Sequence, residues 1–407
     1  MNGSALIAED LCREPRLRIA LVTETYPPEI NGVAMTLGRM VEGLLARGHR
    51  IQLVRPRQLE AETGTRRDEF DECLVHGVTI PRYPDLKFGL PARNALIRLW
   101  SSNRPDVVHV ATEGPLGWSA VSAARRLRLP LSSDFHTNFD SYSHHYGLGW
   151  LRQPVAAYLR RFHNRTRATF VPSREMAQRL SRQGFRGIEV IARGVDCELF
   201  APARRSAALR RSWGLGTNDL VVLSVGRLAP EKNLALSVRA FDAIALEHTG
   251  ARMILVGDGP ARAGLQRERP DLLFAGMRSG DDLAAHYASA DLFLFPSQTE
   301  TYGNVTLEAM ASGLPVLAYD YAAAAEVIRH RDNGLTVPFG DEDALIEQAR
   351  AIAGEPMLAK KLGRAARETA EMLDWERIHD AFAAALGRVA RAAPSAAASS
   401  LLAQGRS

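Results

Sequence analysis

The sequence predicts an α/β protein made of two doubly wound domains, and three observations support this. The chain has 407 residues, about two to three times the length of a typical domain. Hydrophobic residues make up 46% and charged residues 24%, a composition that allows two buried cores. Short aliphatic runs alternate with segments of helical periodicity in both halves, which is typical of parallel sheets covered by helices.

The expected strands form two sets of six. In the first half they cover residues 17–22, 50–54, 106–110, 131–136, 168–173 and 188–192. In the second half they cover residues 219–226, 251–257, 272–276, 291–297, 315–320 and 334–339. Helical segments separate the strands, so each set predicts one parallel sheet with helices on both faces.

The periodicity breaks near residues 194–205, where we expect the domain boundary. The first domain would then span residues 16–195 and the second residues 196–374. Residues 375–392 form an amphipathic segment, which we expect to be a helix that returns to the first domain. The two ends are expected to be a flexible leader and a disordered tail, residues 1–15 and 393–407.

Charge is distributed unevenly. The whole chain has 51 Lys and Arg against 46 Asp and Glu, whereas the first 195 residues hold 28 basic and 19 acidic ones. An anionic membrane, a nucleic acid or a polyanionic substrate would fit such a half, and so would a solvated arginine-rich surface. The sequence contains no recognisable nucleic-acid-binding module, so we expect no nucleic acid partner.

Cysteine usage and the lack of long apolar runs point to the cytoplasm. Cys12, Cys73 and Cys197 are too few and too scattered for a disulfide framework or a zinc site, and we expect free thiols. No run of about 18 apolar residues occurs, and the first residues are too charged for a secretory signal. We therefore expect a cytoplasmic protein.

The first expected strand is followed by a proline pair and the turn Asn31-Gly32, after which a helix should start near Val33 or Ala34. Ligands of doubly wound sheets bind at the carboxyl ends of the strands, so the free N–H groups of this helix would favour an anion there. Gly32 would let the anion approach closely, although a glycine before a helix is also ordinary turn chemistry. This loop has no G-x-G-x-x-G pattern, which disfavours a nicotinamide dinucleotide.

Two cations follow the first strand of the second domain. Arg227 and Lys232 lie in the sequence VGRLAPEKN, in a loop expected to open a helix, and Lys232 is one of only four lysines in the chain. Guanidinium and ammonium groups suit a diphosphate, whose charge grows when a bond to it breaks. The alternative is that both are ordinary surface cations.

Two carboxylates lie eight residues apart in FPSQTETYGNVTLEAMASG. Glu308 is near the start of an expected helix and could accept hydrogen bonds from the adjacent hydroxyls of a ribose. Glu300 precedes the helix and should face the same cleft. The amides of Gly303, Asn304 and Val305 would form another anion site at the helix N-terminus. These features suit a nucleotide sugar.

Together these motifs make the chain resemble a retaining glycosyltransferase of family 4, the glycogen-synthase-like class, which has the GT-B architecture. The resemblance covers roughly residues 16–392 and extends to bacterial lipid mannosyl- and glucosyltransferases. It rests on Asn31-Gly32, DFHTNFDSYSHHYG around His136, ARGVDCELF, GRLAPEKN, VGDGP, AGM and the E-x7-E element.

The resemblance implies roles for these residues in binding the donor. Arg227 and Lys232 would bind the diphosphate and stabilise the leaving group, and Gly32 would meet the same phosphates from the first domain. Glu308 would hold the ribose, and Glu300 the hydroxyls of the donor sugar.

Further positions follow from the same resemblance. The amides of Tyr302 to Val305 would complete the pocket, His136 would lie beside the anomeric carbon, and Gly276-Met277 would line the base pocket. Arg193 stands where the family often has Asn, so the resemblance assigns it no role. Three aromatic or amide residues are expected to contact the acceptor: Asn138, Tyr142 and Tyr146.

The resemblance also implies a mechanism. The sugar of a GDP- or UDP-sugar would be transferred with retention, by same-face attack in which the departing phosphate takes the acceptor's proton. Positive charge and helix ends would do the work of a metal. We therefore expect neither a metal nor a cofactor. The alternative function is a non-catalytic, GT-B-like regulatory protein that only binds nucleotide sugar.

The acceptor is expected to be a lipid or a lipid-linked glycan. Residues 150–193 contain ten arginines, and apolar residues are interleaved with the first of them. A basic helix with an apolar face can lie on an anionic bilayer, so we expect peripheral contact with the inner face of the cytoplasmic membrane. The alternative is an amphipathic helix whose apolar face packs on the core.

Overall fold

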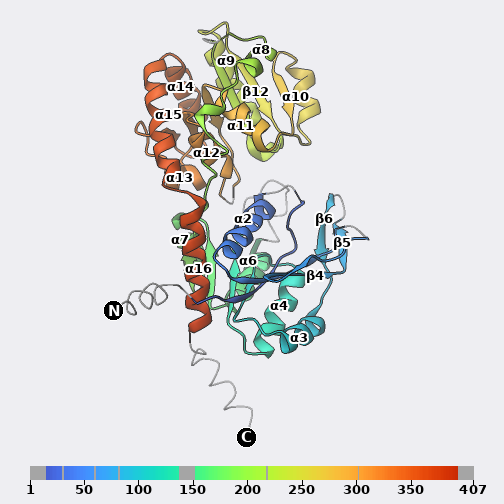
Figure 1. Cartoon of the computed structure of the whole chain (residues 1–407). Coiled ribbons are helices and arrows are strands. Elements are labelled where there is room, and N and C mark those ends of the chain that lie inside the picture. The colour runs from blue at the N-terminus through green and yellow to red at the C-terminus, as the bar shows by residue number, and fades with distance from the viewer. Residues whose placement is uncertain are drawn as a thin grey trace, which may run out of the picture.

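The computed structural model describes residues 15–29, 32–58, 61–80, 83–136, 152–216, 219–300 and 302–392. In these ranges the chain folds into two α/β domains, of which the second lies above the first in Figure 1. The expected leader, apart from Pro15, and the expected tail lie outside the described residues.

The first domain contains an eight-stranded sheet of order β10-β9-β8-β7-β1-β2-β4-β3. Its strands are β1 (Arg18–Val22), β2 (Arg50–Pro56), β3 (Arg66–Arg67), β4 (Phe70–Val75), β7 (Val107–Val110), β8 (Leu131–Asp134), β9 (Ala168–Val171) and β10 (Ile188–Val190). Neighbours are parallel except β3 with β4. Val22 of β1 is level with Val54 of β2 and Val110 of β7, so the loops after these strands emerge at one edge.

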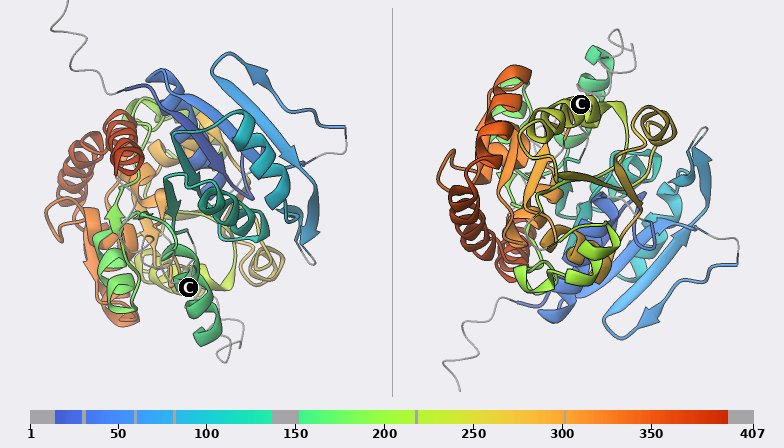
Figure 2. Two further views of the ribbon diagram at one scale, coloured as in Figure 1. Left: turned by 90° about the horizontal axis from the view of Figure 1, so that it is seen from below. Right: turned by 90° about the horizontal axis from the view of Figure 1, so that it is seen from above.

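Helices cover both faces of this sheet because alternate side chains of its strands point to opposite sides. Ile19 and Leu21 pack in a core with α2 and α16, whereas Ala20 and Val22 pack in a core with α3 and α4. The helices are α2 (Gly32–Ala46), α3 (Arg93–Ser102), α4 (Pro115–Arg126), α6 (Arg152–His163), α7 (Arg174–Arg182) and α16 (Trp375–Arg391). A separate hairpin of β5 (Gly77–Ile80) and β6 (Tyr83–Gly89) lies on the side opposite α16 (Figure 2).

The second domain contains a six-stranded parallel sheet of order β13-β12-β11-β14-β15-β16. Its strands are β11 (Val221–Val225), β12 (Arg252–Val256), β13 (Leu273–Gly276), β14 (Leu292–Phe295), β15 (Val316–Tyr319) and β16 (Leu335–Val337). The strand order reverses beside β11, as it does beside β1 in the first sheet. Such reversals open the crevice in which doubly wound domains bind ligands.

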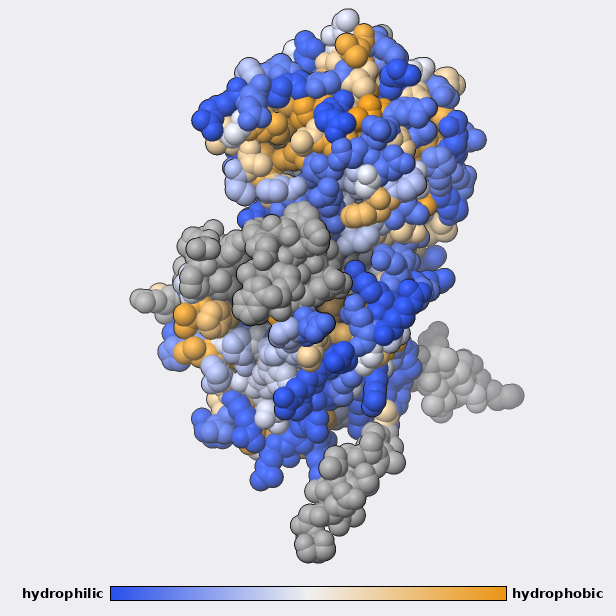
Figure 3. Space-filling view, turned by 180° about the vertical axis from the view of Figure 1, so that it is seen from behind, coloured by the Kyte–Doolittle hydropathy of each residue, from blue (hydrophilic) through white to orange (hydrophobic). Residues whose placement is uncertain are grey.

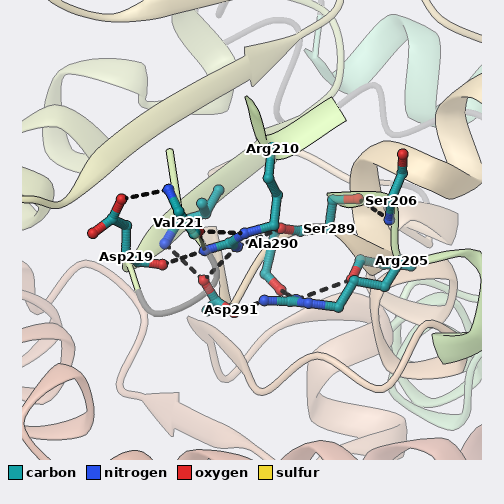
Figure 4. A network of polar contacts seen from close by, with 10 residues as sticks. Arg205, Ser206, Arg210, Asp219, Val221, Ser289, Ala290 and Asp291 are labelled. Atoms are coloured by element: carbon teal, nitrogen blue, oxygen red, sulfur yellow. Dashed lines mark hydrogen bonds and ion pairs between the residues drawn. The ribbon is translucent and has the colours of Figure 1, made fainter. Parts of the chain in front are cut away.

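Helices also cover both faces of the second sheet, which has two separate cores. They are η2 (Pro202–Arg204), α8 (Ala207–Ser212), η3 (Pro230–Lys232), α9 (Leu234–Ala245), α10 (Arg262–Glu268), α11 (Gly280–Ala288), α12 (Asn304–Ala311), α13 (Ala322–Val327), α14 (Glu342–Ala353) and α15 (Pro356–Glu371). The amino edge of the sheet is tied together by the buried Arg210, which donates to the Ser289 carbonyl at 2.8 Å and to Asp291 at 3.0 Å (Figure 4). That edge is therefore structural.

The expected return of the last helix to the first domain is confirmed. α16 runs along the first domain in Figure 1, and its Glu376 and Asp380 pair with Arg47, the residue that follows α2. The two helices touch closely at Gly43, where an added Cβ would lie 2.1 Å from the His379 ring. The second domain is thus anchored to the first by its own C-terminal helix.

Each of the twelve expected strands is present, with ends shifted by a few residues. Helix α2 begins at Gly32 and not at Val33 or Ala34. Strands β3 to β6 were not expected, because they lie in a charged, irregular stretch and β3 is a two-residue edge strand. Cys73 and Cys197 are free thiols as expected, while Cys12 lies outside the described residues. No helix among the described residues is long and apolar enough to cross a bilayer.

Candidate active site

The loops that follow β11 and β14 are joined at the carboxyl edge of the second sheet. The Gln298 N–H donates to the Glu231 carbonyl at 2.9 Å, which ties the loop after β14 to η3. Beside them, Gly257 has φ +131°, and a Cβ on it would lie 2.0 Å from the Gly226 carbonyl oxygen. Only glycine allows this close approach, so the backbone provides a fixed frame for the side chains described next.

Lys232 and Glu300 meet within this frame. The Lys232 ammonium contacts the Glu300 carboxylate and lies 5.5 Å from the centroid of the Phe295 ring. The two side chains are only 18% and 14% exposed. Arg227, in contrast, is exposed, and its guanidinium makes no hydrogen bond or ion pair with the residues that the structure describes. One predicted cation is therefore paired and the other faces solvent.

The predicted anion site at the start of α12 has the expected backbone shape. Gly303 is the N-cap with φ +97°, and no side chain from the described parts of the chain caps the helix. Among the described residues, the amides of Asn304 and Val305 thus have no side-chain acceptor, and the helix dipole favours an anion there. A Cβ on Gly303 would lie 3.5 Å from Cγ of Glu300, so this turn packs directly against the paired carboxylate.

Glu308 lies one turn further along α12. The Tyr287 hydroxyl donates to its carboxylate at 2.8 Å. Burial raises the Glu308 pKa from 4.5 to about 7, and the tyrosine hydrogen bond only partly offsets this. No cation among the described residues pairs with Glu308. The fold thus keeps a carboxylate whose charge is poorly compensated by the protein.

His136 closes a buried polar cluster in the first domain. Its Nε2 lies 3.1 Å from Asp134, and Arg193 donates to its Nδ1 at 3.2 Å. Burial tends to raise the pKa of Asp134, but His109 and His136 together lower it well below its ordinary value. Both nitrogens of His136 therefore face protein groups, and the cluster holds the ring in one orientation.

The sequence analysis did not predict Asp134 as a site residue and gave Arg193 no role. Asp134 ends the buried strand LSSD, and a carboxylate in a buried strand is a sequence signal that could have identified it. Arg193 is buried, and its charge acts on both Asp134 and Tyr302. Tyr302 belongs to the loop after β14, so the charge of Arg193 acts on a residue of the second domain.

Other predicted residues make none of the side-chain contacts described above for Lys232, Glu300, Glu308 and His136. Gly32 is the first residue of α2 and is exposed, and a Cβ on it would have no neighbour within 4 Å. Gly276 ends β13 with φ +74°, and its carbonyl accepts from the Gly257 N–H. Met277 follows it and is 59% exposed. The remaining predictions lie outside the described residues: Asn31, Asn138, Tyr142 and Tyr146.

Helix α6 buries part of the apolar face that we expected to lie on a bilayer. Leu159 and Phe162 are 6% and 0% exposed, because they pack against the sheet. Tyr158 is 42% exposed, and Arg160 and Arg161 are exposed as well. Residues 150 and 151 lie outside the described residues, and contact with a membrane stays a prediction. Figure 3 shows mainly hydrophilic residues, with smaller hydrophobic areas, on this face of the first domain.

The described residues contain no group of three or more His, Cys, Asp or Glu side chains that could hold a metal ion. Lys232, Arg227 and the amides at the start of α12 are the groups of this site that could bind an anion. Together with Glu300 and Glu308 they could hold a phosphorylated ligand that carries hydroxyl groups at both ends.

Comparison with protein families assigns both halves of the chain. A model described as Glycosyltransferase Family 4 matches residues 30–199, and one described as Glycosyl transferases group 1 matches residues 206–369. The boundary between the two matches falls at residues 200–205.

Individual relatives were also found. A GDP-mannose-dependent alpha-mannosyltransferase of Mycobacterium tuberculosis is 34% identical over 339 residues, which are 82% of this chain and 87% of the relative. The alpha-monoglucosyldiacylglycerol synthase of Streptococcus pneumoniae is 26% identical over 316 residues, or 74% and 71% of the two chains. Among solved structures, Anabaena HepE in complex with UDP has a TM-score of 0.73 at 20% identity, covering 91% of this chain and 99% of that one.

The raised pKa of Glu308 predicts a pH-dependent loss of stability. Between pH 4.5 and about 7 the unfolded state loses the Glu308 proton first, so the folded state becomes less stable as pH rises, and the loss is complete above pH 7. Glu308→Gln should therefore raise the free energy of unfolding at pH 8, by up to about 3 kcal/mol, and the gain should shrink towards pH 5.

Urea unfolding at pH 8 and pH 5 measures this effect. Glu368→Gln on α15 is the matched control, because Glu368 is exposed. A gain at pH 8 no larger than the gain at pH 5 would show that Glu308 is not a poorly compensated carboxylate.

Proposed function

Since the chain belongs to glycosyltransferase family 4 and is a GT-B glycosyltransferase that uses a nucleotide sugar, we propose that it moves a mannose- or glucose-type hexose to a hydroxyl of a lipid or lipid-linked glycan. The observation that carries the proposal is the contact of Lys232 with Glu300 beside the start of α12, where Gly303 is the N-cap. The printed names of the relatives support the sugar and acceptor classes, with GDP-mannose as the first donor to test.

Charge explains how this site would lower the barrier. When the bond from the anomeric carbon to the diphosphate breaks, negative charge grows on the leaving phosphate. Lys232, the exposed Arg227 and the amides of α12 are placed to stabilise that charge, and one such donor is typically worth about 10²–10³ in kcat. These groups make a divalent cation unnecessary for leaving-group departure, so turnover should persist in EDTA.

Retention is proposed to arise from attack on the same face from which the diphosphate leaves. A double displacement would need a free carboxylate below the anomeric carbon. In this proposal Glu300 binds hydroxyls of the donor sugar, and Glu308, which is held by Tyr287, binds the ribose, so neither acts as that nucleophile. The acceptor oxygen therefore forms the new bond as the old one breaks, and the departing phosphate takes the acceptor's proton. Nuclear magnetic resonance of the product gives its anomeric configuration.

A membrane-associated acceptor is supported by the exposed basic side of α6 and by the lipid product in the name of one relative. Because Leu159 and Phe162 of α6 are buried, the contact would be mainly electrostatic, and each exposed Arg would add about 1 kcal/mol near the surface. Salt-sensitive co-sedimentation with vesicles containing anionic lipid, absent with neutral vesicles, would support this contact.

A thermal-shift screen should identify the donor. GDP-mannose, UDP-glucose, UDP-galactose and their nucleoside diphosphates are compared, and a ligand at 100 times its Kd adds about 2.7 kcal/mol of stability. At least one sugar nucleotide should raise Tm, and the same compound should support transfer to a lipid extract. Absence of any shift, together with absence of transfer, would contradict the proposal.

Substitution of either cation should affect turnover sharply. Lys232→Ala and Arg227→Ala are each expected to lower kcat by about 10²-fold or more, because each removes charge from the leaving group. Lys360→Ala on α15 is the control, since Lys360 is exposed and lies near the amino edge of the sheet. A near-wild-type kcat for Lys232→Ala would show that Lys232 does not stabilise the leaving group.

Gly32→Ala separates ligand approach from folding. A Cβ at Gly32 meets no protein atom within 4 Å, so Tm should not fall, whereas a phosphate that approaches the start of α2 would be blocked and turnover should fall about tenfold or more. Gly264→Ala in α10 is the matched control, because its Cβ also meets nothing within 4 Å. Equal activity of the two variants would argue against a phosphate contact at Gly32.

A further inference from the structure

We propose that Glu326 is a positioning residue, which couples the contact between the two domains to the geometry of the loop that carries Glu300. The inference deepens the proposed function and rests on it, because it takes Glu300 as the group that holds the donor sugar. It is carried by two sets of contacts that meet on one short helix, α13.

The first set crosses from the second domain to the first. The Glu326 carboxylate of α13 accepts from the main-chain N–H groups of Arg174 at 2.7 Å and Glu175 at 3.1 Å. These are the first two residues of α7, and the next N–H, of Met176, is capped by Ser173 within the same domain. A carboxylate at a helix N-terminus is favoured by the free N–H groups and by the helix dipole. Two N–H groups at the start of α7 thus find their hydrogen-bond acceptor in the other domain.

The second set of contacts joins α13 to the loop between β14 and α12, which carries Glu300 and is called the donor loop below. The Tyr321 hydroxyl, just before α13, donates to the Glu300 carbonyl at 3.1 Å. The Ala323 N–H donates to the Tyr302 carbonyl at 2.8 Å. The loop is therefore held on both sides of residue 301 by the helix that carries Glu326, and a shift of α13 would move the backbone of Glu300.

The charge of Arg193, in the boundary segment, acts on the same loop. Arg193 donates to His136 of the first domain, and its charge acts on Tyr302, which is 5% exposed. The donor loop is therefore joined to the first domain by hydrogen bonds through α13 and Glu326, and Arg193 adds an electrostatic interaction. Separation of the domains would break the Glu326 contact and release α13, so that Glu300 is correctly placed only when the domains are together.

The test compares binding of the whole donor with binding of the nucleotide alone. GDP-mannose and GDP are the probes, or UDP-glucose and UDP if the donor screen selects uridine. For Glu326→Ala we expect kcat/KM to fall about tenfold or more while the Kd for the nucleoside diphosphate stays within about twofold. Glu326→Gln keeps one acceptor oxygen and should recover part of the loss. Glu368→Ala, an exposed control on α15, should match the wild type.

A purely structural role for Glu326 would lower Tm and weaken nucleotide binding together, and that result would overturn the inference, as would an unchanged kcat/KM. In a Glu300→Gln background, Glu326→Ala should add less than about a twofold loss. If Glu300→Gln alone keeps wild-type turnover, the proposed role of Glu300 fails first, and the coupling fails with it. Should Glu326→Ala not fold, Glu326→Gln carries the same comparison with the same expected direction.

Discussion

The contact between Lys232 and Glu300 determines how the rest of the site must work. Without a ligand, each of these largely buried groups neutralises the other, which avoids the cost of an unpaired buried charge. In the proposed site, a nucleotide sugar would bring a diphosphate for Lys232 and hydroxyls for Glu300, so it could replace both halves of the pair at once. A nucleotide without the sugar would take the lysine and leave the carboxylate without its cation. The pair would therefore favour the complete donor over its product, which would assist product release.

This exchange of partners requires that the backbone of the loops carrying Lys232 and Glu300 keeps its position when the ligand binds. The frame consists of backbone contacts: the loop after β14 is bonded to η3, and Gly257 allows two loops to cross closely. The same loop is held by α13, which reaches the first domain through Glu326, and the charge of Arg193 acts on its Tyr302. The parallel sheets fix which loops meet, and these hydrogen bonds fix their shape.

The sequence predicted the parts of the molecule that depend on local order. Hydrophobic periodicity predicted the twelve strands and the returning helix. Motif spacing identified Lys232 and Glu300 in the loops after strands and Glu308 on α12 as candidate site residues. What could not be predicted were contacts between distant segments. Arg193 and Glu326 are unremarkable in the sequence, and their partners lie 57 residues away for Arg193 and about 150 for Glu326. The burial of Leu159 and Phe162 of α6 could not be predicted for the same reason, since amphipathicity does not identify the element that covers a helix.

Two buried carboxylates show how the fold separates support from ligand binding. Asp134 has a lowered pKa because two histidines compensate its charge, so the protein itself satisfies it. Glu308 has a raised pKa because a tyrosine hydroxyl is its partner and no described cation pairs with it. A carboxylate that costs stability in the free protein is retained where something else supplies its hydrogen bonds. Two ribose hydroxyls would do so, and the energy regained would add to donor affinity at the pH where the carboxylate is charged.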